Sequence, residues 1–203
     1  MQSVFYLEKS EKGTSQITIK SKLLERRIIV LDCKVSAASV GEIIAQISLL
    51  AAESNEPITL FINSPGGSVQ DGLVLVDVMR SSPCVIKTVA LGLSASIAAV
   101  ILAAGTKGHR YITESGKTML HQPQVTRSVG GNCTQMEEMA KNLVSRKKQL
   151  NSLLRELTGS DEKTIEELTS KDTYLTAKQT LHHGLADTVA KGEVLNRLLV
   201  GAA

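Results

Sequence analysis

Short apolar runs rich in β-branched residues alternate with segments of helical period along the first 120 residues. Four runs predict buried strands, at residues 27–31, 58–62, 85–91 and 117–120. Between them, residues 39–54 and 68–80 repeat their apolar positions with the spacing of an amphipathic helix. Strands that alternate with helices of this length are typical of βαβ units. The pattern therefore predicts an α/β fold with a largely parallel sheet covered by helices.

The longest apolar run covers residues 89–104 and is interrupted by Gly92, Ser94 and Ser96. It falls short of the roughly 20 residues that a membrane-spanning helix needs, so it predicts a buried strand that leads directly into a buried helix. The first 15 residues lack a basic stretch followed by an apolar one. A secretory signal is therefore not expected. We expect a cytoplasmic protein.

The strongest helix signal follows residue 131. Asn132 and Gln135 have the spacing of a capping box, and Gly159 supplies a stop about 26 residues later, which corresponds to ~39 Å of helix. A single domain does not need so long a helix for its own core, so we expect part of it to project and pack against another subunit. The alternative is a long amphipathic surface helix. A second cap at Ser160 predicts a short helix that ends at Leu168.

Composition narrows the class of protein. The 203 residues suit one domain, and the 42% hydrophobic content lies almost entirely in aliphatic residues, since the chain has five aromatic residues and no Trp. So few rings argue against nucleic-acid or sugar binding by stacking. The net charge of +3 is spread along the chain, which disfavours a phosphate-tracking surface. Cys33, Cys84 and Cys133 lie far apart without metal-ligand spacing, so reduced structural thiols are expected.

Two glycine-containing segments could carry chemistry. In residues 63–68 (NSPGGS), adjacent glycines could turn backbone amides outward as an oxyanion hole or anion nest, although a plain turn is the simpler interpretation. Residues 92–99 (GLSASIAA) place a serine where a strand meets a helix, as in a nucleophile elbow. Ser94 and Ser96 both fit, and either could instead be an ordinary helix N-cap.

A serine nucleophile needs a base, and four histidines are available. His121 ends a predicted strand, at the sheet edge where the helix after Ser96 would begin. His109, His182 and His183 lie in polar surroundings, so solvated surface positions are expected for them, and metal binding by histidine is poorly supported.

A carboxylate would orient the base. Asp161 resembles a helix-start charge, Asp187 a turn residue, and Asp172 lies between a predicted helix and an apolar turn that could be buried. Spacing alone does not choose among these three.

Taken in order, these segments resemble the proteolytic subunit of the Clp protease family. The matching stretches are FINSPGGSV (61–69), GLSASIAA (92–99), ILAAGTKGHR (101–110), MLHQP (119–123), TSKDTYLTA (169–177) and HGLAD (183–187). They span nearly the whole chain, and their ordered set is highly specific. The resemblance implies an α/β fold of the Clp protease/crotonase-like type, with repeated β-β-α units and a projecting long handle helix.

The resemblance also implies the site residues. It assigns Ser96 as nucleophile, His121 as general base and Asp172 as the residue that orients the base. The backbone N–H groups of Gly67 and Ile97 would form the oxyanion hole. The implied activity is a serine endopeptidase that hydrolyses peptide bonds of unfolded proteins.

The resemblance further implies an assembly of two stacked seven-membered rings, fed by a partner AAA+ unfoldase that uses ATP. This chain has no phosphate-binding loop of its own, and no cofactor or metal is expected. A single domain is implied, with residues 1–20 as an axial segment, 21–120 and 160–203 as a head, and 121–159 as the handle region.

Three departures from the family pattern stand out. The loop after His121 is about two residues longer than usual, and Ala98 stands where glycine is usual. Thr59 and Ser81 replace bulky aromatics in the surface groove that receives the unfoldase. We therefore expect this subunit to bind an unfoldase weakly. We also expect it to function together with a second Clp-type paralogue in a mixed ring.

Two other classes of function are weighed against the protease. One is a weakly active or structural subunit that forms rings and contributes little cleavage. The other is an acyl-CoA enzyme of the related crotonase fold, which also uses paired backbone amides but normally lacks Ser, His and Asp in this order.

Overall fold

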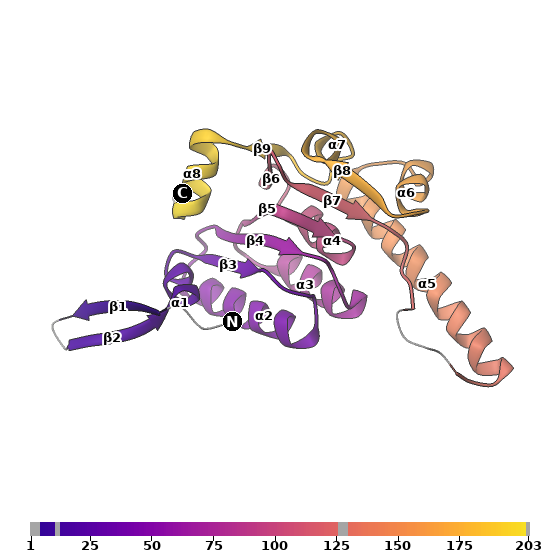
Figure 1. The fold of residues 1–203 in the computed structure, drawn as a ribbon, viewed down its shortest axis with the longest axis horizontal. Helices are drawn as coiled ribbons and strands as arrows, with labels where there is room; N and C mark the ends of the chain where they lie inside the picture. Colours follow the sequence, from indigo (N-terminus) through magenta and orange to yellow (C-terminus); the bar gives the residue numbers. More distant parts are fainter. Residues whose placement is uncertain (1–4, 11–12, 126–129, 202–203) are drawn as a thin grey trace.

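The computed structural model describes residues 5–10, 13–125 and 130–201. The strands are β1 (Phe5–Ser10), β2 (Gly13–Thr18), β3 (Ile28–Leu31), β4 (Ile58–Ser64), β5 (Ile86–Ala95), β6 (Arg110–Thr113), β7 (Lys117–Leu120), β8 (Thr173–Thr176) and β9 (Thr188–Ala190). The helices are α1 (Ile19–Leu24), α2 (Ala37–Glu53), α3 (Val69–Ser81), α4 (Ile97–Ala103), α5 (Cys133–Thr158), α6 (Glu162–Thr169), α7 (Ala177–His182) and α8 (Gly192–Val200). The predicted α/β class is confirmed (Figure 1).

The main sheet is parallel except at one edge. Its strands run in the order β3-β4-β5-β6-β9, and β7 pairs with the second half of β5. β8 then adds to β7 as an antiparallel strand. Because β5 has ten residues, its first half can pair with β6 and its second half with β7. The end of β5 and the end of β7 therefore meet at one edge of the sheet.

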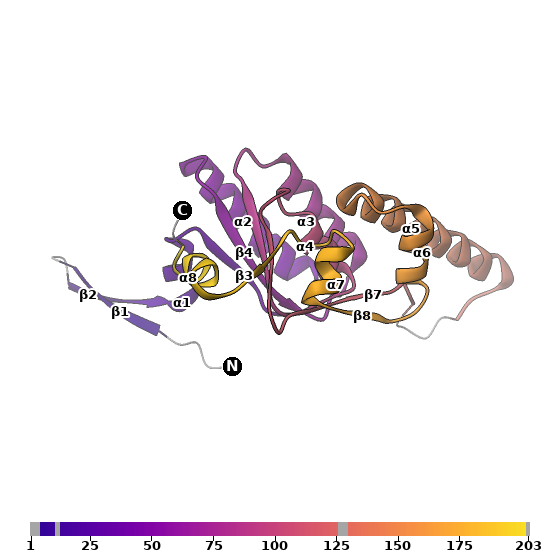
Figure 2. The same ribbon diagram turned by 90° about the horizontal axis from the view of Figure 1, so that it is seen from above.

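The core forms where α2 and α3 cover one face of this sheet, as Figures 1 and 2 show. Alternate residues of β4 (Ile58, Leu60 and Ile62) are essentially buried on that face, whereas Phe61 packs into a smaller cluster with Leu198 of α8. Both faces of β4 are covered, which explains its nearly continuous apolar sequence. Thr59 is only 6% exposed, so its expected position in a surface groove is wrong for the single chain.

The long helix α5 begins and ends as the sequence predicts. Asn132 and Gln135 form a reciprocal capping box, and Gly159 ends the helix with φ +75°. Among its residues only Leu150 and Leu154 are buried, both in the second half, while Met136, Met139 and Val144 in the first half are exposed. The first half therefore projects from the body of the molecule (Figure 1).

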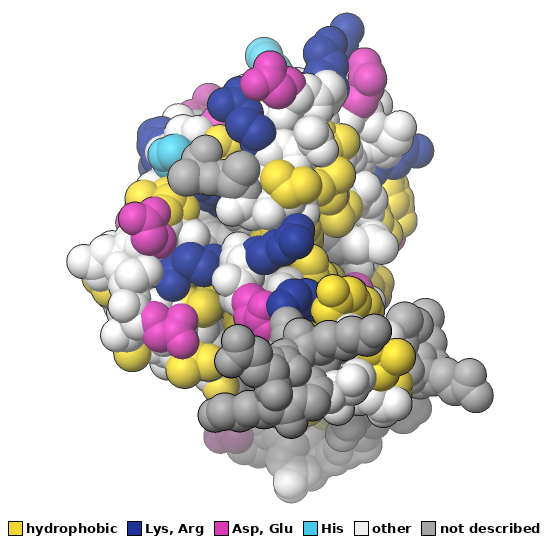
Figure 3. Space-filling model, turned by 90° about the vertical axis from the view of Figure 1, so that its left-hand side faces the viewer, with side chains coloured by type: hydrophobic (Ala, Val, Ile, Leu, Met, Phe, Trp, Pro, Cys, Tyr) yellow, Lys and Arg dark blue, Asp and Glu magenta, His cyan; other side chains and the backbone are white. Residues whose placement is uncertain are grey.

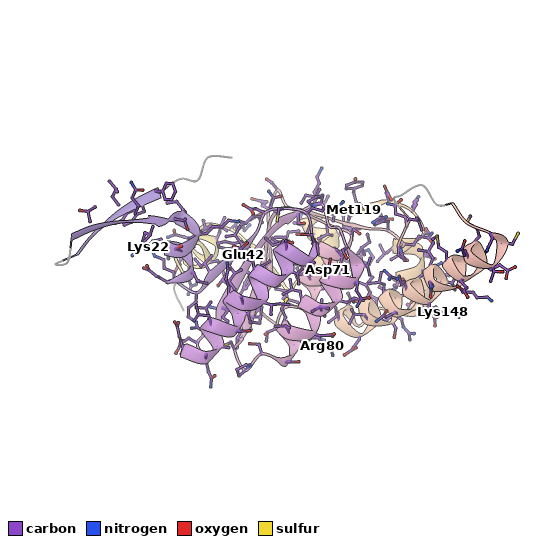
Figure 4. All side chains as sticks on the ribbon, turned by 90° about the horizontal axis from the view of Figure 1, so that it is seen from below. Lys22, Glu42, Asp71, Arg80, Met119 and Lys148 are labelled. Atoms are coloured by element: carbon purple, nitrogen blue, oxygen red, sulfur yellow. The ribbon has the colours of Figure 1, made fainter. Side chains whose placement is uncertain are left out.

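Figure 4 shows Arg80 at the end of α3 beside the base of α5, and Arg80 forms an ion pair with Glu156. At the opposite end of the molecule the β1–β2 hairpin projects from α1, with Phe5, Tyr6 and Leu7 about half exposed. On that side, Figure 3 shows hydrophobic, basic and acidic side chains interspersed rather than a block of positive charge.

Two local expectations are wrong. The helix after α5 is capped by Asp161 rather than Ser160, because the Asp161 carboxylate accepts from the Thr164 amide at 2.7 Å. These backbone and side-chain hydrogen bonds from Thr164 lower the pKa of Asp161. His109 is half-buried rather than fully solvated, since its Nδ1 is buried and has no hydrogen-bond partner among the residues that the structure describes. Asp187 lies in the turn before β9, as expected, and it also pairs with the buried Arg110 at 2.6 Å.

His183 also departs from the expected surface position. It is half-buried at the end of α7, and desolvation, followed by the neighbouring His182, lowers its pKa. Within the described ranges no helix combines the length and apolar character needed to cross a membrane.

Candidate active site

Ser96 lies in a sharp turn between β5 and α4. Its φ of +57° and ψ of −126° are an unusual conformation for a residue other than glycine. Such strain persists only where the surroundings enforce it, and it is typical of nucleophile elbows. Here the Ser96 amide donates to the Met119 carbonyl at 2.7 Å, which ties the turn to the end of β7. The Ser96 hydroxyl makes no cap to α4, so it is available for other contacts.

The two glycines after Pro65 pack against this turn. Gly66 has φ +85°, and a Cβ there would lie 2.5 Å from the Ala95 carbonyl oxygen and 2.8 Å from the Ser96 Cβ. Gly67 has φ +155°, and a Cβ would lie 2.1 Å from the Val35 carbonyl oxygen. No other residue fits this close approach of three backbone segments. Gly67 lines the same cavity as Ser96.

Ile97 begins α4, and its side chain is buried. As the first residue of a helix, its N–H has no partner within that helix. Among the hydrogen bonds of the described residues, neither the Gly67 nor the Ile97 amide is a donor. Within this part of the chain, neither amide is therefore occupied by a protein acceptor.

His121 follows β7 directly and faces the turn. Its Nε2 lies 2.8 Å from the Ser96 Oγ, which is hydrogen-bonding distance. The side chain is 13% exposed. The expectation that the end of the strand 117–120 meets the start of the helix after Ser96 is therefore confirmed in geometry. This contact is the one that general-base activation of a serine requires.

Asp172 lies in the loop between α6 and β8. Its Oδ1 is 3.7 Å from the His121 Nδ1, which is too long for a hydrogen bond, and its side chain is 65% exposed. Leu175 in the apolar segment that follows is buried, as the sequence suggested, but Asp172 itself is exposed. The pairing of β8 with β7, in which Leu120 lies opposite Thr173, still brings this loop beside His121.

Gln124 is a site residue that the sequence did not indicate. Its side-chain amide nitrogen lies 3.3 Å from the His121 Nδ1, closer than Asp172 does. Only its position three residues after His121 could have drawn attention to it.

An open cavity of about 1290 Å³ lies beside Ser96 and His121. Ser96, His121, Gly67 and Gln124 line it, together with charged side chains of both signs from Lys34, Asp71, Glu138 and Arg146. Figure 4 shows Asp71 and Met119, two lining residues, on the side of the body from which α5 leaves. The volume of the cavity exceeds the roughly 300–1,000 Å³ of a typical small-molecule pocket.

The other candidates lie apart from this arrangement. Ser94 is 0% exposed, so it offers no reactive hydroxyl to the cavity. Asp161 and Asp187 are occupied in a helix cap and in the Arg110 ion pair. Cys84 is buried, but Cys33 and Cys133 are exposed thiols, so the expected structural role does not fit those two. Across the described residues no group of His, Cys, Asp and Glu could hold a metal ion.

The chain is similar in sequence to known proteins of one family. A family model described as Clp protease matches residues 11–193. The chain is 35% identical over 188 residues to the ATP-dependent Clp protease proteolytic subunit of Ligilactobacillus salivarius (strain UCC118), covering 92% of this chain and 94% of that protein. It is also 38% identical over 175 residues to the ATP-dependent Clp protease proteolytic subunit 3, chloroplastic, of Arabidopsis thaliana, covering 86% of this chain and 56% of that protein.

Proposed function

Because the chain belongs to the Clp protease family, we propose that Ser96, His121 and Asp172 form its catalytic triad and hydrolyse peptide bonds of unfolded proteins. The observation that carries the proposal is the 2.8 Å contact from the His121 Nε2 to the Ser96 Oγ, made by a serine held at φ +57°. A strained serine in contact with a histidine is the arrangement of an activated nucleophile.

The chemistry is acyl transfer. Ser96 Oγ attacks the peptide carbonyl while His121 Nε2 takes its proton, and His121 then returns the proton to the leaving amine. Water, deprotonated by His121, attacks the acyl-enzyme and releases the second product. Asp172 stabilises the imidazolium that forms in each half-reaction, for which its carboxylate must approach from 3.7 Å to about 2.8 Å.

The oxyanion of each tetrahedral intermediate would be held by the amides of Gly67 and Ile97. Support comes from the absence of a protein acceptor for either amide among the described hydrogen bonds, and from the packing of the PGG turn onto Ser96. Backbone donors fixed in advance cost no reorganisation during the reaction, which makes them effective at stabilising developing charge.

The exposed surface of α5 supports an oligomer. A helix of 26 residues with Met136, Met139 and Val144 exposed on its projecting half is poorly explained in an isolated chain. We propose that it is the handle between two stacked heptameric rings, as part of the handle region 121–159. Residues 21–120 and 160–203 would form the head, and 1–20 the axial segment, although α1 already begins at Ile19.

We further propose a cytoplasmic assembly whose partner is an AAA+ unfoldase that consumes ATP, while this chain needs no cofactor. An apolar hollow of about 340 Å³ between α2 and α3, lined by Ile47, Val78 and Ser81, supports this proposal, since a hydrophobic loop of the unfoldase could contact it. Ser81 contributes little apolar area there, so we propose weak docking and a mixed ring with a second Clp-type paralogue.

The alternatives are less well supported. A purely structural subunit has no need for the Ser96–His121 contact or for the strain at Ser96. An acyl-CoA enzyme would use the paired amides but not a serine and histidine in hydrogen-bonding contact.

The test is hydrolysis of a fluorogenic peptide by the full-length protein, in its assembled form. Ser96→Ala and His121→Ala should each abolish turnover, whereas the exposed His182→Ala should not change it. Turnover that survives Ser96→Ala would contradict the proposal.

A further inference from the structure

The ring nitrogen of His121 that faces away from Ser96 has two competing partners. The Asp172 Oδ1 lies 3.7 Å from Nδ1, beyond hydrogen-bonding distance. The amide nitrogen of Gln124 lies 3.3 Å from the same Nδ1, at the long end of that range. Gln124 is therefore the nearer partner of Nδ1.

The contact with the Gln124 amide nitrogen determines which ring nitrogen of His121 carries the proton. An amide nitrogen donates hydrogen bonds and does not accept them. In the structure the Gln124 amide presents its nitrogen to Nδ1. In this orientation Nδ1 pairs with it only as an acceptor, which puts the single ring proton of the neutral imidazole on Nε2. In that tautomer Nε2 donates to the Ser96 Oγ and has no lone pair with which to take the serine proton. A carboxylate at Nδ1 selects the opposite, productive tautomer.

A hydrogen bond links the segment that contains Gln124 to the segment that contains Asp172. The Gln122 side-chain amide donates to the Ser170 carbonyl at 3.1 Å, two residues before Asp172. The Asp172 side chain is 65% exposed, and its carboxylate needs to move by only about 1 Å to reach Nδ1 at charge-assisted hydrogen-bond length. Gln124 also lines the cavity, where a peptide would compete for its amide.

We propose that Gln124 is a positioning residue that holds His121 in a resting tautomer, and that a peptide in the cavity draws the Gln124 amide away so that Asp172 takes Nδ1. The proposal rests on the proposed triad. Gln124 acts only through His121, without touching the reacting atoms.

The first test reads the tautomer directly and needs no activity. Nitrogen-15 NMR of histidine-labelled full-length protein, at a pH of about 8 where histidine side chains are ordinarily neutral, distinguishes the protonated from the bare ring nitrogen. The His121 signals are assigned by their loss in His121→Ala. The wild-type protein should carry the proton on Nε2, and Gln124→Leu should move it to Nδ1. Gln46→Leu is the matched control, because Gln46 pairs with Glu42 on α2.

A wild-type His121 with its proton on Nδ1, or no change in Gln124→Leu, would overturn the proposal. This result stands even if the triad proves inactive, so failure of the proposed function and failure of the proposal about Gln124 are distinguishable.

The second test measures the rate of Ser96 labelling by a fluorophosphonate. Gln124→Leu should label roughly 2- to 10-fold faster than wild type, the range that one neutral hydrogen bond supplies. In an Asp172→Asn background the same substitution should bring no acceleration, since no carboxylate is present to take over Nδ1. A rate equal to wild type, or equal acceleration in both backgrounds, would show that Gln124 acts only on loop structure.

Discussion

The Arg110–Asp187 ion pair holds together parts of the chain that are distant in sequence. The Arg110 side chain is 3% exposed, and its guanidinium donates to the Asp187 carboxylate and to the carbonyls of Ala103 and Leu157. The carboxylate also accepts from the backbone amides of Gly108 and Arg110. The pair thus joins β6 and the turn before β9 to the ends of α4 and α5.

Asp187→Asn removes the counter-charge and leaves Arg110 buried. Breaking a buried ion pair from one side costs about 3–5 kcal/mol of unfolding free energy, because the remaining charge loses its compensation. For a chain of this length that corresponds to a fall of roughly 6–20 °C in melting temperature. The assay is thermal unfolding followed by circular dichroism at one fixed chain concentration. Asp32→Asn, which breaks the exposed Lys20–Asp32 pair, is the control and should change stability by under about 1 kcal/mol.

The pH dependence of the unfolding free energy provides a second test of the Arg110–Asp187 ion pair. Partial burial acts to raise the pKa of Asp187, but the hydrogen bonds and charge of Arg110 outweigh it and hold the pKa below the ordinary value of 3.8. A carboxyl group of this kind stabilises the fold above its unfolded-state pKa, and the contribution is lost as the pH falls through the folded-state value. The stability difference between wild type and Asp187→Asn should therefore shrink below about pH 4. A variant within about 1 kcal/mol of wild type at neutral pH would refute the reasoning.

Three further predictions concern the site and the long helix. Gly67→Ala should lower kcat for a fluorogenic peptide by about 10²- to 10³-fold, because a Cβ 2.1 Å from the Val35 carbonyl oxygen displaces the amide, and an unchanged kcat would exclude that amide from the oxyanion hole. Val144→Asp should lower the mass measured by analytical ultracentrifugation, since it places a charge in the proposed handle contact, and a wild-type mass of one chain would rule out that contact. Asn132→Ala removes the cap of α5 and should cost about 1 kcal/mol in unfolding, whereas no loss would mean that the cap contributes nothing.

Strong local signals in the sequence identified the central elements. β4 and the first half of β5 are largely buried on both faces and have apolar sequences, and α5 has cap residues at both ends. β6 (RYIT) and β9 (TVA) are short, and neither contains an apolar run like the one that identified β4. Ser160 and Asp161 are both good caps, and only the Thr164 contact decides between them.

The site was only partly predictable for a related reason. Spacing could not choose between Ser94 and Ser96, because the choice depends on which one β5 buries and which one the turn presents. His121 was predictable, since the end of a parallel strand lies at a known edge of the sheet. The long approach of Asp172 and the competing contact of Gln124 depend on side-chain placement in two loops, which no residue pattern encodes.

The central claim is that Ser96 is a nucleophile activated by His121. The most direct measurement is reaction of the assembled protein with a fluorophosphonate, followed by mass-spectrometric mapping of the modified peptide. The account predicts one adduct, on Ser96, that is lost in His121→Ala. An adduct on another serine, or none when the assembly is provided with its unfoldase, would contradict it.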